Sequence, residues 1–196
     1  MFSLLSWLLT VLFKLKTQKA LFMLNPCHIT ILIQIYLMMN KNTKFNTMVY
    51  TAWTGWLFGP YMATFIPHLN GIDEFEILLY FVEHLAIIPC GYLILNYRYG
   101  FPTPTLKNHL PAFSTIALWQ FWVLVPFSRT NMVNLNFALC HSPADPSFDV
   151  VGPYYFVVCT LFLNFFAYLF RWLSWIQIKI VYGILSIFGV KPAKKL

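Results

Sequence analysis

The feature that most constrains this chain is a series of apolar runs, each long enough to cross a lipid bilayer. A helix needs about 20 apolar residues to span the hydrocarbon core. Such runs recur along the sequence at 20–39, 47–66, 76–95, 110–127, 152–170 and 172–190. Arg171, between the last two runs, is interpreted as an anchor at the end of a span. The pattern predicts an all-α, polytopic membrane helix bundle with about six transmembrane helices, or roughly five to seven.

Composition supports a membrane protein over a soluble one. Hydrophobic residues make up 59% of the 196 residues and charged residues only 10%, with a mean hydropathy of +0.66, whereas a soluble domain is about 25% charged. The net charge of +7 does not indicate nucleic-acid binding, because the 13 Lys and Arg residues are spread through short loops and the tail. There they suit topology signals and lipid-headgroup contacts. The expected partner is the membrane, and the sequence leaves the oligomeric state open.

The chain shows no repeat or linker, so we expect a single transmembrane domain over 1–196. Residues 1–19 combine a short apolar run with three lysines, which favours an interfacial helix or a truncated span. Residues 129–151 form the longest polar stretch, rich in Asn and Pro, and predict a loop that covers one end of the bundle like a lid. The four cysteines show no paired spacing and there is no phosphate-binding glycine loop, so we expect no metal and no cofactor.

The segment Leu24-Asn25-Pro26-Cys27-His28 heads the first of these runs. Asn25 suits the N-cap of a helix, and Pro26 suits its first position, where a backbone N–H would have no partner. Cys27 and His28 then fall in the first turn. Free backbone N–H groups and the positive end of the helix dipole favour an anion there, which biases the Cys27 thiol towards the reactive thiolate.

Polar side chains inside the runs are expected to face the bundle interior, because polar groups are costly in hydrocarbon. Cys27, Thr30 and Gln34 share one helix face at spacings of three and four residues. The third run carries its own polar set, which is Glu76, Tyr80, Glu83 and His84. We predict that the two faces line one shared interior.

His84 is the strongest candidate for acid–base chemistry, because an imidazole takes and releases protons near neutral pH. Glu83 lies about 100° round the helix from His84, so it is free to pair elsewhere. Both residues also have a structural interpretation, since a buried Cys often acts as a small hydrophobe and a membrane His can join helices. The residues thus leave three hypotheses open: an enzyme, a lipid- or ion-handling path gated by His84 and Glu83, and a membrane scaffold.

Three ordered motifs resemble the transmembrane protein 164 family. They are Asn-Pro-Cys-His at 25–28, Phe-Glu-Ile-Leu-Leu-Tyr-Phe-Val-Glu-His at 75–84 and Val-Asn-Leu-Asn-Phe-Ala-Leu-Cys at 133–140, within a match over residues 20–155. The resemblance implies a multi-pass enzyme of endoplasmic reticulum or Golgi membranes. Such an acyltransferase places polyunsaturated chains, notably arachidonoyl, on ether phospholipids. It also implies a nucleophilic Cys27 and, as base, His84. Glu83 departs from the family pattern, in which Gln is expected.

We therefore expect a membrane acyltransferase that moves an acyl chain from a phospholipid or acyl-CoA donor to a lysophospholipid through a thioester on Cys27. The alternative is a non-enzymatic lipid- or ion-handling protein with a polar path gated by His84 and Glu83. Residues that would bind substrate or support the catalytic pair are predicted on all three motifs: Asn25, His28, Thr30, Gln34, Tyr80, Glu83, Asn134 and Asn136.

Overall fold

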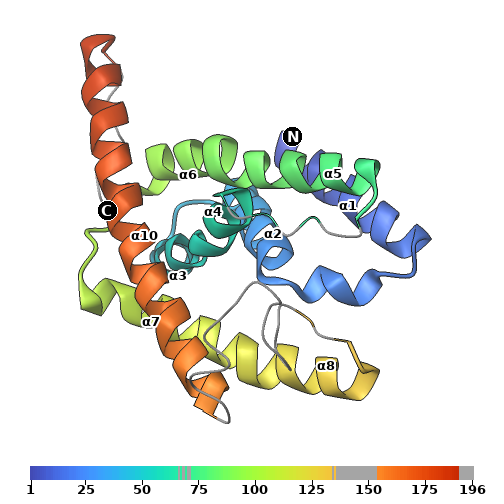
Figure 1. Cartoon of the computed structure of the whole chain (residues 1–196). Coiled ribbons are helices and arrows are strands. Elements are labelled where there is room, and N and C mark those ends of the chain that lie inside the picture. Colours follow the sequence, from blue (N-terminus) through green and yellow to red (C-terminus); the bar gives the residue numbers. More distant parts are fainter. Residues whose placement is uncertain (66, 68, 70–71, 134, 136–153, 190–196) are drawn as a thin grey trace.

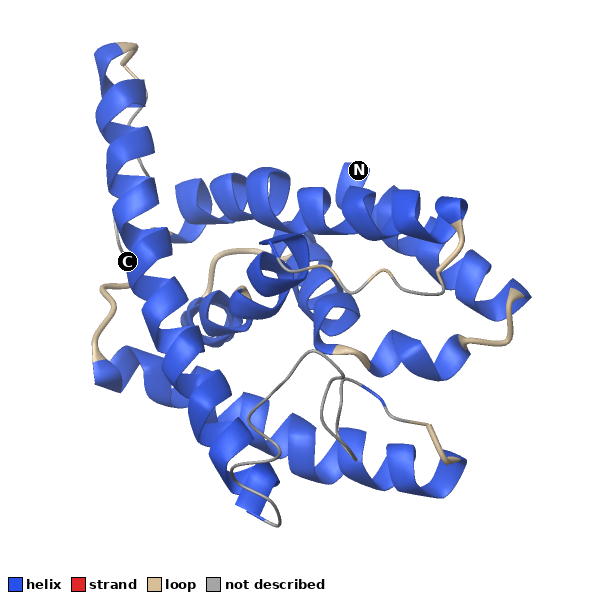
Figure 2. Ribbon diagram, viewed as in Figure 1, coloured by secondary structure: helices blue, strands red, loops and turns tan. Residues whose placement is uncertain are grey.

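The structure is a computed structural model that describes residues 1–196 except 66, 68, 70–71, 134, 136–153 and 190–196. Within those described residues every regular element is helical, as Figure 2 shows. The main helices are α1 (Phe2–Lys16), α2 (Pro26–Met39), α3 (Lys44–Trp56), α4 (Phe58–Phe65), α5 (Glu74–Leu85), α6 (Tyr92–Tyr99), α7 (Leu106–Leu118), α8 (Val125–Asn131) and α10 (Tyr155–Ile187). The predicted all-α class is confirmed.

Among the described residues, three helical stretches are long and apolar enough to cross a membrane. The first, Glu74–Tyr99, joins α5 to α6 through a π-helical turn at Ala86–Gly91. The second, Leu106–Asn131, joins α7 to α8 through a π-helical turn at Trp119–Leu124. The third is Thr160–Ile187 within α10, and Pro26–Met39 is a shorter apolar helix. The chain is therefore an all-α integral membrane protein.

Several of the expected spans have different bounds in the structure. The run 20–39 is divided at Asn25, whose extended backbone (φ −60°, ψ 144°) is the conformation favoured before a proline. The run 47–66 is divided between α3 and α4, because Pro60 has no N–H to bond the carbonyl of Trp56. The stretch 129–151 begins in helix rather than loop, since α8 continues to Asn131, and most of the rest lies outside the described residues.

The two spans predicted at 152–170 and 172–190 are wrong as separate elements, because α10 is one continuous helix of 33 residues. The apolar pattern places the boundary at Arg171, interpreted as an anchor at the end of a span. The structure instead turns Arg171 inward, with 1% of its side chain exposed. A charge that faces the interior does not end a helix, and in Figure 1 α10 runs past the other helices without a break.

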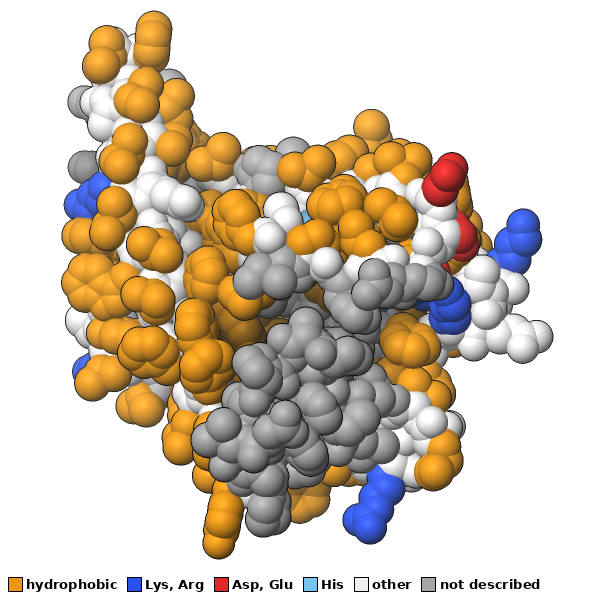
Figure 3. All heavy atoms as spheres, viewed as in Figure 1, with side chains coloured by type: hydrophobic (Ala, Val, Ile, Leu, Met, Phe, Trp, Pro, Cys, Tyr) orange, Lys and Arg blue, Asp and Glu red, His pale blue; other side chains and the backbone are white. Residues whose placement is uncertain are grey.

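Compared with a soluble protein, this chain exposes more hydrophobic side chains and buries more polar ones. Figure 3 shows hydrophobic side chains along the length of α10, while Lys, Arg and acidic side chains lie at the margins of this view. Polar residues such as Thr30, Gln34, Glu83 and His84 are buried instead. The apolar core lies between α2, α3 and α6, with Ile31, Leu37, Tyr50, Trp53 and Leu95. This distribution is typical of a bundle surrounded by lipid.

Helix α1 packs against α2 and α5 with a stripe of small hydroxyl residues. Ser3, Ser6 and Thr10 are buried at a spacing of three and four residues, whereas Leu5 and Leu12 on the other side are exposed. The last turn of α1 and the segment that follows it are tied to α5 by one lysine each. Lys14 and Lys19 both form ion pairs with Glu76, the second at 2.6 Å from Nζ to Oε2. These contacts fix α1 over the first turn of α5.

Candidate functional site

The first turn of α2 carries the candidate nucleophile. The helix begins at Pro26 with Asn25 in the N-cap position, as predicted. The Asn25 side chain makes no capping hydrogen bond, and its buried Oδ1 has no hydrogen-bond partner. Cys27 is a free, half-buried thiol. The N–H groups of His28 and Ile29 both donate to the carbonyl of Asn25, which leaves the Cys27 N–H as the first-turn donor next to this thiol.

The second half of the site comes from the last turn of α5. His28 Nδ1 lies 2.6 Å from Glu83 Oε1, and both side chains are almost fully buried. The carboxylate accepts, so Nδ1 of His28 donates, and the imidazole is held in one orientation. The hydroxyl of Thr10 on α1 also reaches Glu83. Glu83 therefore pairs away from His84, as its position on the helix suggested, and its partner is the residue after Cys27.

His84 has a defined tautomer in this arrangement. Its Nδ1 lies 2.6 Å from the carbonyl oxygen of Tyr80 in the preceding turn. A carbonyl only accepts, so Nδ1 carries a proton, and in the neutral imidazole Nε2 then holds a lone pair. Nε2 is buried and has no hydrogen-bond partner among the described residues, and the Tyr80 ring lies tilted by 40° at 4.2 Å between centroids. In its neutral form the imidazole is therefore an acceptor with a free nitrogen.

The thiol and these side chains occupy one neighbourhood. Cys27 is within electrostatic range of the Glu83 carboxylate and of the Tyr80 hydroxyl. No hydrogen bond joins Cys27 to His84 in the described part of the chain. The described geometry thus brings α2 and α5 together through His28 and Glu83. A substrate group would have to connect the sulfur and the imidazole.

Thr30 and Gln34 serve the packing around this cluster. The Thr30 hydroxyl donates to the carbonyl of Pro26, and the Trp53 indole donates to the carbonyl of Thr30. Gln34 donates both amide hydrogens, to Ser3 Oγ at 2.8 Å and to the carbonyl of Ala86 at 2.9 Å. Ala86 begins a π-helical turn, a distortion often found beside functional sites. Gln34 therefore holds together α1, α2 and the turn that follows His84.

Sequence reasoning missed the contribution of α1. Ser3 bonds Gln34 and Thr10 approaches Glu83, so two hydroxyls of this helix contact the polar face of the site. The signal was present in the regular spacing of Ser3, Ser6 and Thr10 within an apolar run. Asn134 and Asn136, the two remaining predicted site residues, lie outside the described residues.

An apolar groove of about 390 Å³ opens beside the same stretch of α2. Ile29 and Ile33 form its wall on α2, and the other lining residues come from α3 and the α7 span: Trp56, Thr115, Leu118, Trp119, Trp122 and Val123. Ile29 lies two residues from Cys27, about 200° round the helix, so the groove and the thiol lie on different faces of α2. Its lining is almost wholly hydrocarbon and aromatic, which suits an alkyl chain.

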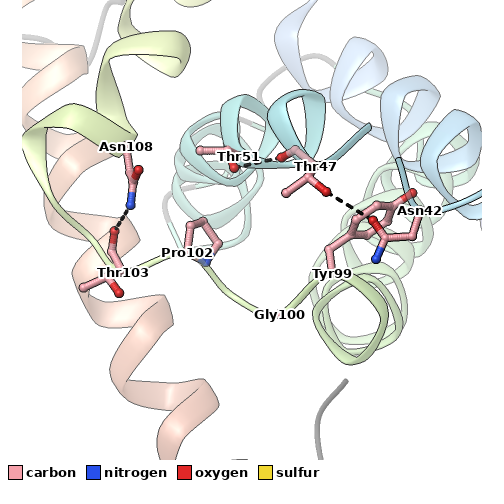
Figure 4. Close-up of a pocket in the computed structure, with 8 residues that line it drawn as sticks. All are labelled: Asn42, Thr47, Thr51, Tyr99, Gly100, Pro102, Thr103 and Asn108. Carbon is pink, nitrogen blue, oxygen red and sulfur yellow. Dashed lines mark hydrogen bonds between the residues drawn. The ribbon is translucent and has the colours of Figure 1, made fainter. Parts of the chain in front are cut away.

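A second, polar pocket of about 180 Å³ lies between the start of α3, the end of α6 and the start of α7. Figure 4 shows it lined by Asn42, Thr47, Thr51, Tyr99, Gly100, Pro102, Thr103 and Asn108. Thr47 donates to Asn42 Oδ1, and Asn108 Nδ2 donates to the carbonyl of Thr103. Across the described ranges, no group of three or more His, Cys, Asp or Glu side chains gathers to hold a metal.

Together these features define a helical integral membrane protein with a thiol, two imidazoles and a carboxylate gathered in its interior. The chain belongs to the TMEM164 family, whose model matches residues 1–172, and this confirms the resemblance found in the sequence motifs. It is 27% identical over 123 residues to a protein described as transmembrane protein 164 homolog from Dictyostelium discoideum. That match covers 62% of this chain and 44% of the relative, so the chain spans less than half of the relative's length. No solved structure matches the chain.

Proposed function

We propose that this protein is a membrane acyltransferase in which Cys27 carries the acyl chain as a thioester. The observation that supports the proposal most directly is the contact between His28 and Glu83, which brings the thiol-bearing turn of α2 to the end of α5 that holds His84. A nucleophile, a base with a free nitrogen and a group that orients them are the components of covalent acyl transfer. The substrate class is a phospholipid or acyl-CoA donor and a lysophospholipid acceptor.

In the first half of the reaction, Cys27 Sγ attacks the carbonyl carbon of the donor. The thiol proton passes to Nε2 of His84, a bond forms between sulfur and carbon, and the bond from carbon to the donor's leaving oxygen or sulfur breaks. The proton on Nε2 then passes to the leaving group. The backbone N–H of Cys27 in the first turn of α2 would stabilise negative charge on the carbonyl oxygen.

In the second half, the hydroxyl of the acceptor attacks the thioester. His84 Nε2 takes the hydroxyl proton, the new ester bond forms and the sulfur leaves as the thiolate. The proton then returns from His84 to Cys27, which restores the starting state. The protein alone completes the cycle with no net redox change.

The apolar groove suits an acyl chain in this proposal. A polyunsaturated chain bound along Ile29 and Ile33 would contact the aromatic residues of the far wall with its double bonds, and its carboxyl end would reach Cys27 only by passing round the first turn of α2. The family resemblance adds the finer assignment of arachidonoyl as acyl chain, an ether phospholipid as acceptor and the endoplasmic reticulum or Golgi as location. In this proposal Glu83 and His28 are positioning residues, which set the relative placement of α2 and α5.

The proposal is tested by acyl transfer from a labelled phospholipid to a lysophospholipid in membranes that contain the protein. Cys27→Ala and Cys27→Ser should both lose transfer, because neither side chain provides a thiolate. Intact-mass measurement after incubation with donor alone should detect an acyl adduct on the wild type and none on Cys27→Ala. Cys159→Ala, which removes another cysteine of the chain, is the matched control and should keep both signals. Unchanged transfer in both Cys27 variants would remove the nucleophile assignment.

A further inference from the structure

A second buried polar cluster lies away from Cys27, around Arg171 on α10. The side chain is among the largest fully buried ones, and it lies within the membrane-spanning part of the helix. Its Nη1 donates to the backbone carbonyl of Asn108 on α7. Its Nε and Nη2 are buried and have no hydrogen-bond partner in the part of the chain that the structure describes. Arginine cannot give up its charge in a protein, so the free N–H groups of Nε and Nη2 still require hydrogen-bond acceptors.

The residues around Arg171 are polar but carry no negative charge. The guanidinium is within electrostatic range of the phenols of Tyr50, Tyr92 and Tyr168, and of the imidazole of His109. The Tyr50 hydroxyl is also buried without a partner. Three helices besides α10 therefore contribute neutral groups to a positively charged interior.

The acidic side chains that the structure describes are all engaged or exposed elsewhere. Glu76 pairs with Lys14 and Lys19, and Glu83 pairs with His28. Asp73 and Glu74 are exposed at the start of α5. No described carboxylate compensates Arg171, although an uncompensated charge buried in a membrane bundle costs several kcal/mol by order of magnitude. Such a cost is typical of a functional site rather than of packing.

We propose that Arg171 forms an interior site for an oxyanion, which it binds through two oxygens. Nε and Nη2 form one edge of the planar guanidinium, and this edge matches two oxygens of a phosphate or a carboxylate. The free hydroxyl of Tyr50 can donate a further hydrogen bond. The ligand class is a lipid phosphate, free phosphate or a fatty-acid carboxylate. This site does not depend on the proposed acyl transfer.

The polar pocket in Figure 4 adjoins this cluster. Asn108 belongs to both, since it lines the pocket and its backbone carbonyl accepts the hydrogen bond from Arg171. Tyr99, which also lines the pocket, stacks on Tyr50 with 5.1 Å between ring centroids. A volume of about 180 Å³ holds several water-sized groups, at about 30 Å³ each. In the proposal an anion enters through this uncharged polar pocket and reaches Arg171 when the side chains between them move.

The test is equilibrium binding to the purified protein in detergent with four probes: oleoyl lysophosphatidic acid, oleic acid, inorganic phosphate and uncharged monooleoylglycerol. At least one of the three anions should bind more tightly than monooleoylglycerol. Binding of inorganic phosphate would identify the free ion as sufficient, binding of only the lipid phosphate would identify a headgroup, and preference for oleic acid would identify a carboxylate. Equal binding of all four probes would overturn the proposal.

Variants locate the site. Arg171→Met should weaken anion binding by about tenfold or more, which corresponds to the loss of about 1.4 kcal/mol of charge-assisted hydrogen bonding. Lys179→Met removes an exposed cation from the same helix and should leave binding unchanged. Arg171→Lys keeps the charge but not the planar edge, and should bind several-fold more weakly even if Arg171→Met fails to fold. Anion binding equal to wild type in Arg171→Lys, or equal losses in Arg171→Met and Lys179→Met, would contradict the site.

Discussion

The Nδ1 of His28 and the Oε1 of Glu83 lie 2.6 Å apart, and this contact links residues 55 positions apart in the sequence. It fixes the first turn of α2 against the last turn of α5, with Cys27 and His84 each next to one of the two partners. The distance between the candidate nucleophile and the candidate base therefore depends on a hydrogen-bonded pair to which neither belongs.

Breaking this pair should reduce activity more than stability if it acts by positioning. Glu83→Gln keeps a hydrogen-bond acceptor of the same size, so we expect a loss of stability of about 1 kcal/mol. Acyl transfer should fall at least tenfold, because the two helices lose their charged link. Glu83→Leu leaves His28 buried without its partner and should cost about 3 kcal/mol.

The measurement combines thermal unfolding in detergent with single-turnover acylation of Cys27. A double-mutant cycle with His28→Gln isolates the pair, since the second substitution should add little once the first is made. Additive losses from Glu83→Gln and His28→Gln would show that the two residues act separately.

His84→Ala should lower the acylation rate of Cys27 by about 10²-fold or more, because the general base is lost. The effect should appear in the rate of thioester formation and not in donor binding, since the apolar groove is intact. Rapid-quench measurement of the acyl adduct against donor concentration separates the two. Tyr80→Phe is the comparison variant, because it keeps the ring beside His84 and removes only a hydroxyl that bonds the carbonyl of Ala63. A rate equal to wild type in His84→Ala would exclude this base.

Gly91 should not tolerate a side chain. A Cβ at this position would lie 1.9 Å from Cδ of Gln34, so Gly91→Ala forces the amide away from the carbonyl of Ala86. We expect a loss of about 1–3 kcal/mol from overpacking. Gly183→Ala on α10 is the matched control, because nothing lies within 4 Å of its added Cβ.

The control should be neutral or stabilising by up to about 1 kcal/mol, as expected for Ala in place of Gly in a helix. Combining Gly91→Ala with Gln34→Ala should recover part of the lost stability, since the clash is removed. Thermal unfolding of the wild type, Gly91→Ala, Gly183→Ala and the Gly91→Ala/Gln34→Ala double variant provides the comparison. Equal melting temperatures for Gly91→Ala and Gly183→Ala would contradict the close approach of Gln34 to the π-helical turn.

Glu76 should control how firmly α1 is held. Its carboxylate is almost buried and binds both Lys14 and Lys19, so Glu76→Gln should release the C-terminal end of α1. Amide hydrogen exchange in residues 10–19 should become faster, with little change in α7. Glu74→Gln removes an exposed carboxylate from the same turn and should leave exchange unchanged. Unaltered protection in Glu76→Gln would mean that α1 is held by its hydroxyl stripe alone.

The fold class and the start of α2 follow from local sequence. Apolar runs predict membrane helices, and Asn25-Pro26 predicts a helix that begins at Pro26. The partner of Glu83 could not be derived in the same way, because helical spacing indicates which side chains share a face but not which other helix meets it. The prediction that Arg171 anchors the end of a span is wrong for a related reason. A hydropathy pattern shows where a charged residue lies in the sequence but not whether its side chain points into the bundle.

Helix α1 places its hydroxyls inward and its leucines outward, which has a consequence for biogenesis. In a bilayer without its neighbours, α1 would present Ser3, Ser6 and Thr10 to lipid, and α5 without α1 and α2 would present Glu83. Each unmatched polar group costs of the order of 2 kcal/mol or more in hydrocarbon. Helix α1 must therefore wait for a segment made some sixty residues later before its hydroxyls are covered, so this part of the bundle is completed only when α1 and α5 are in the membrane together.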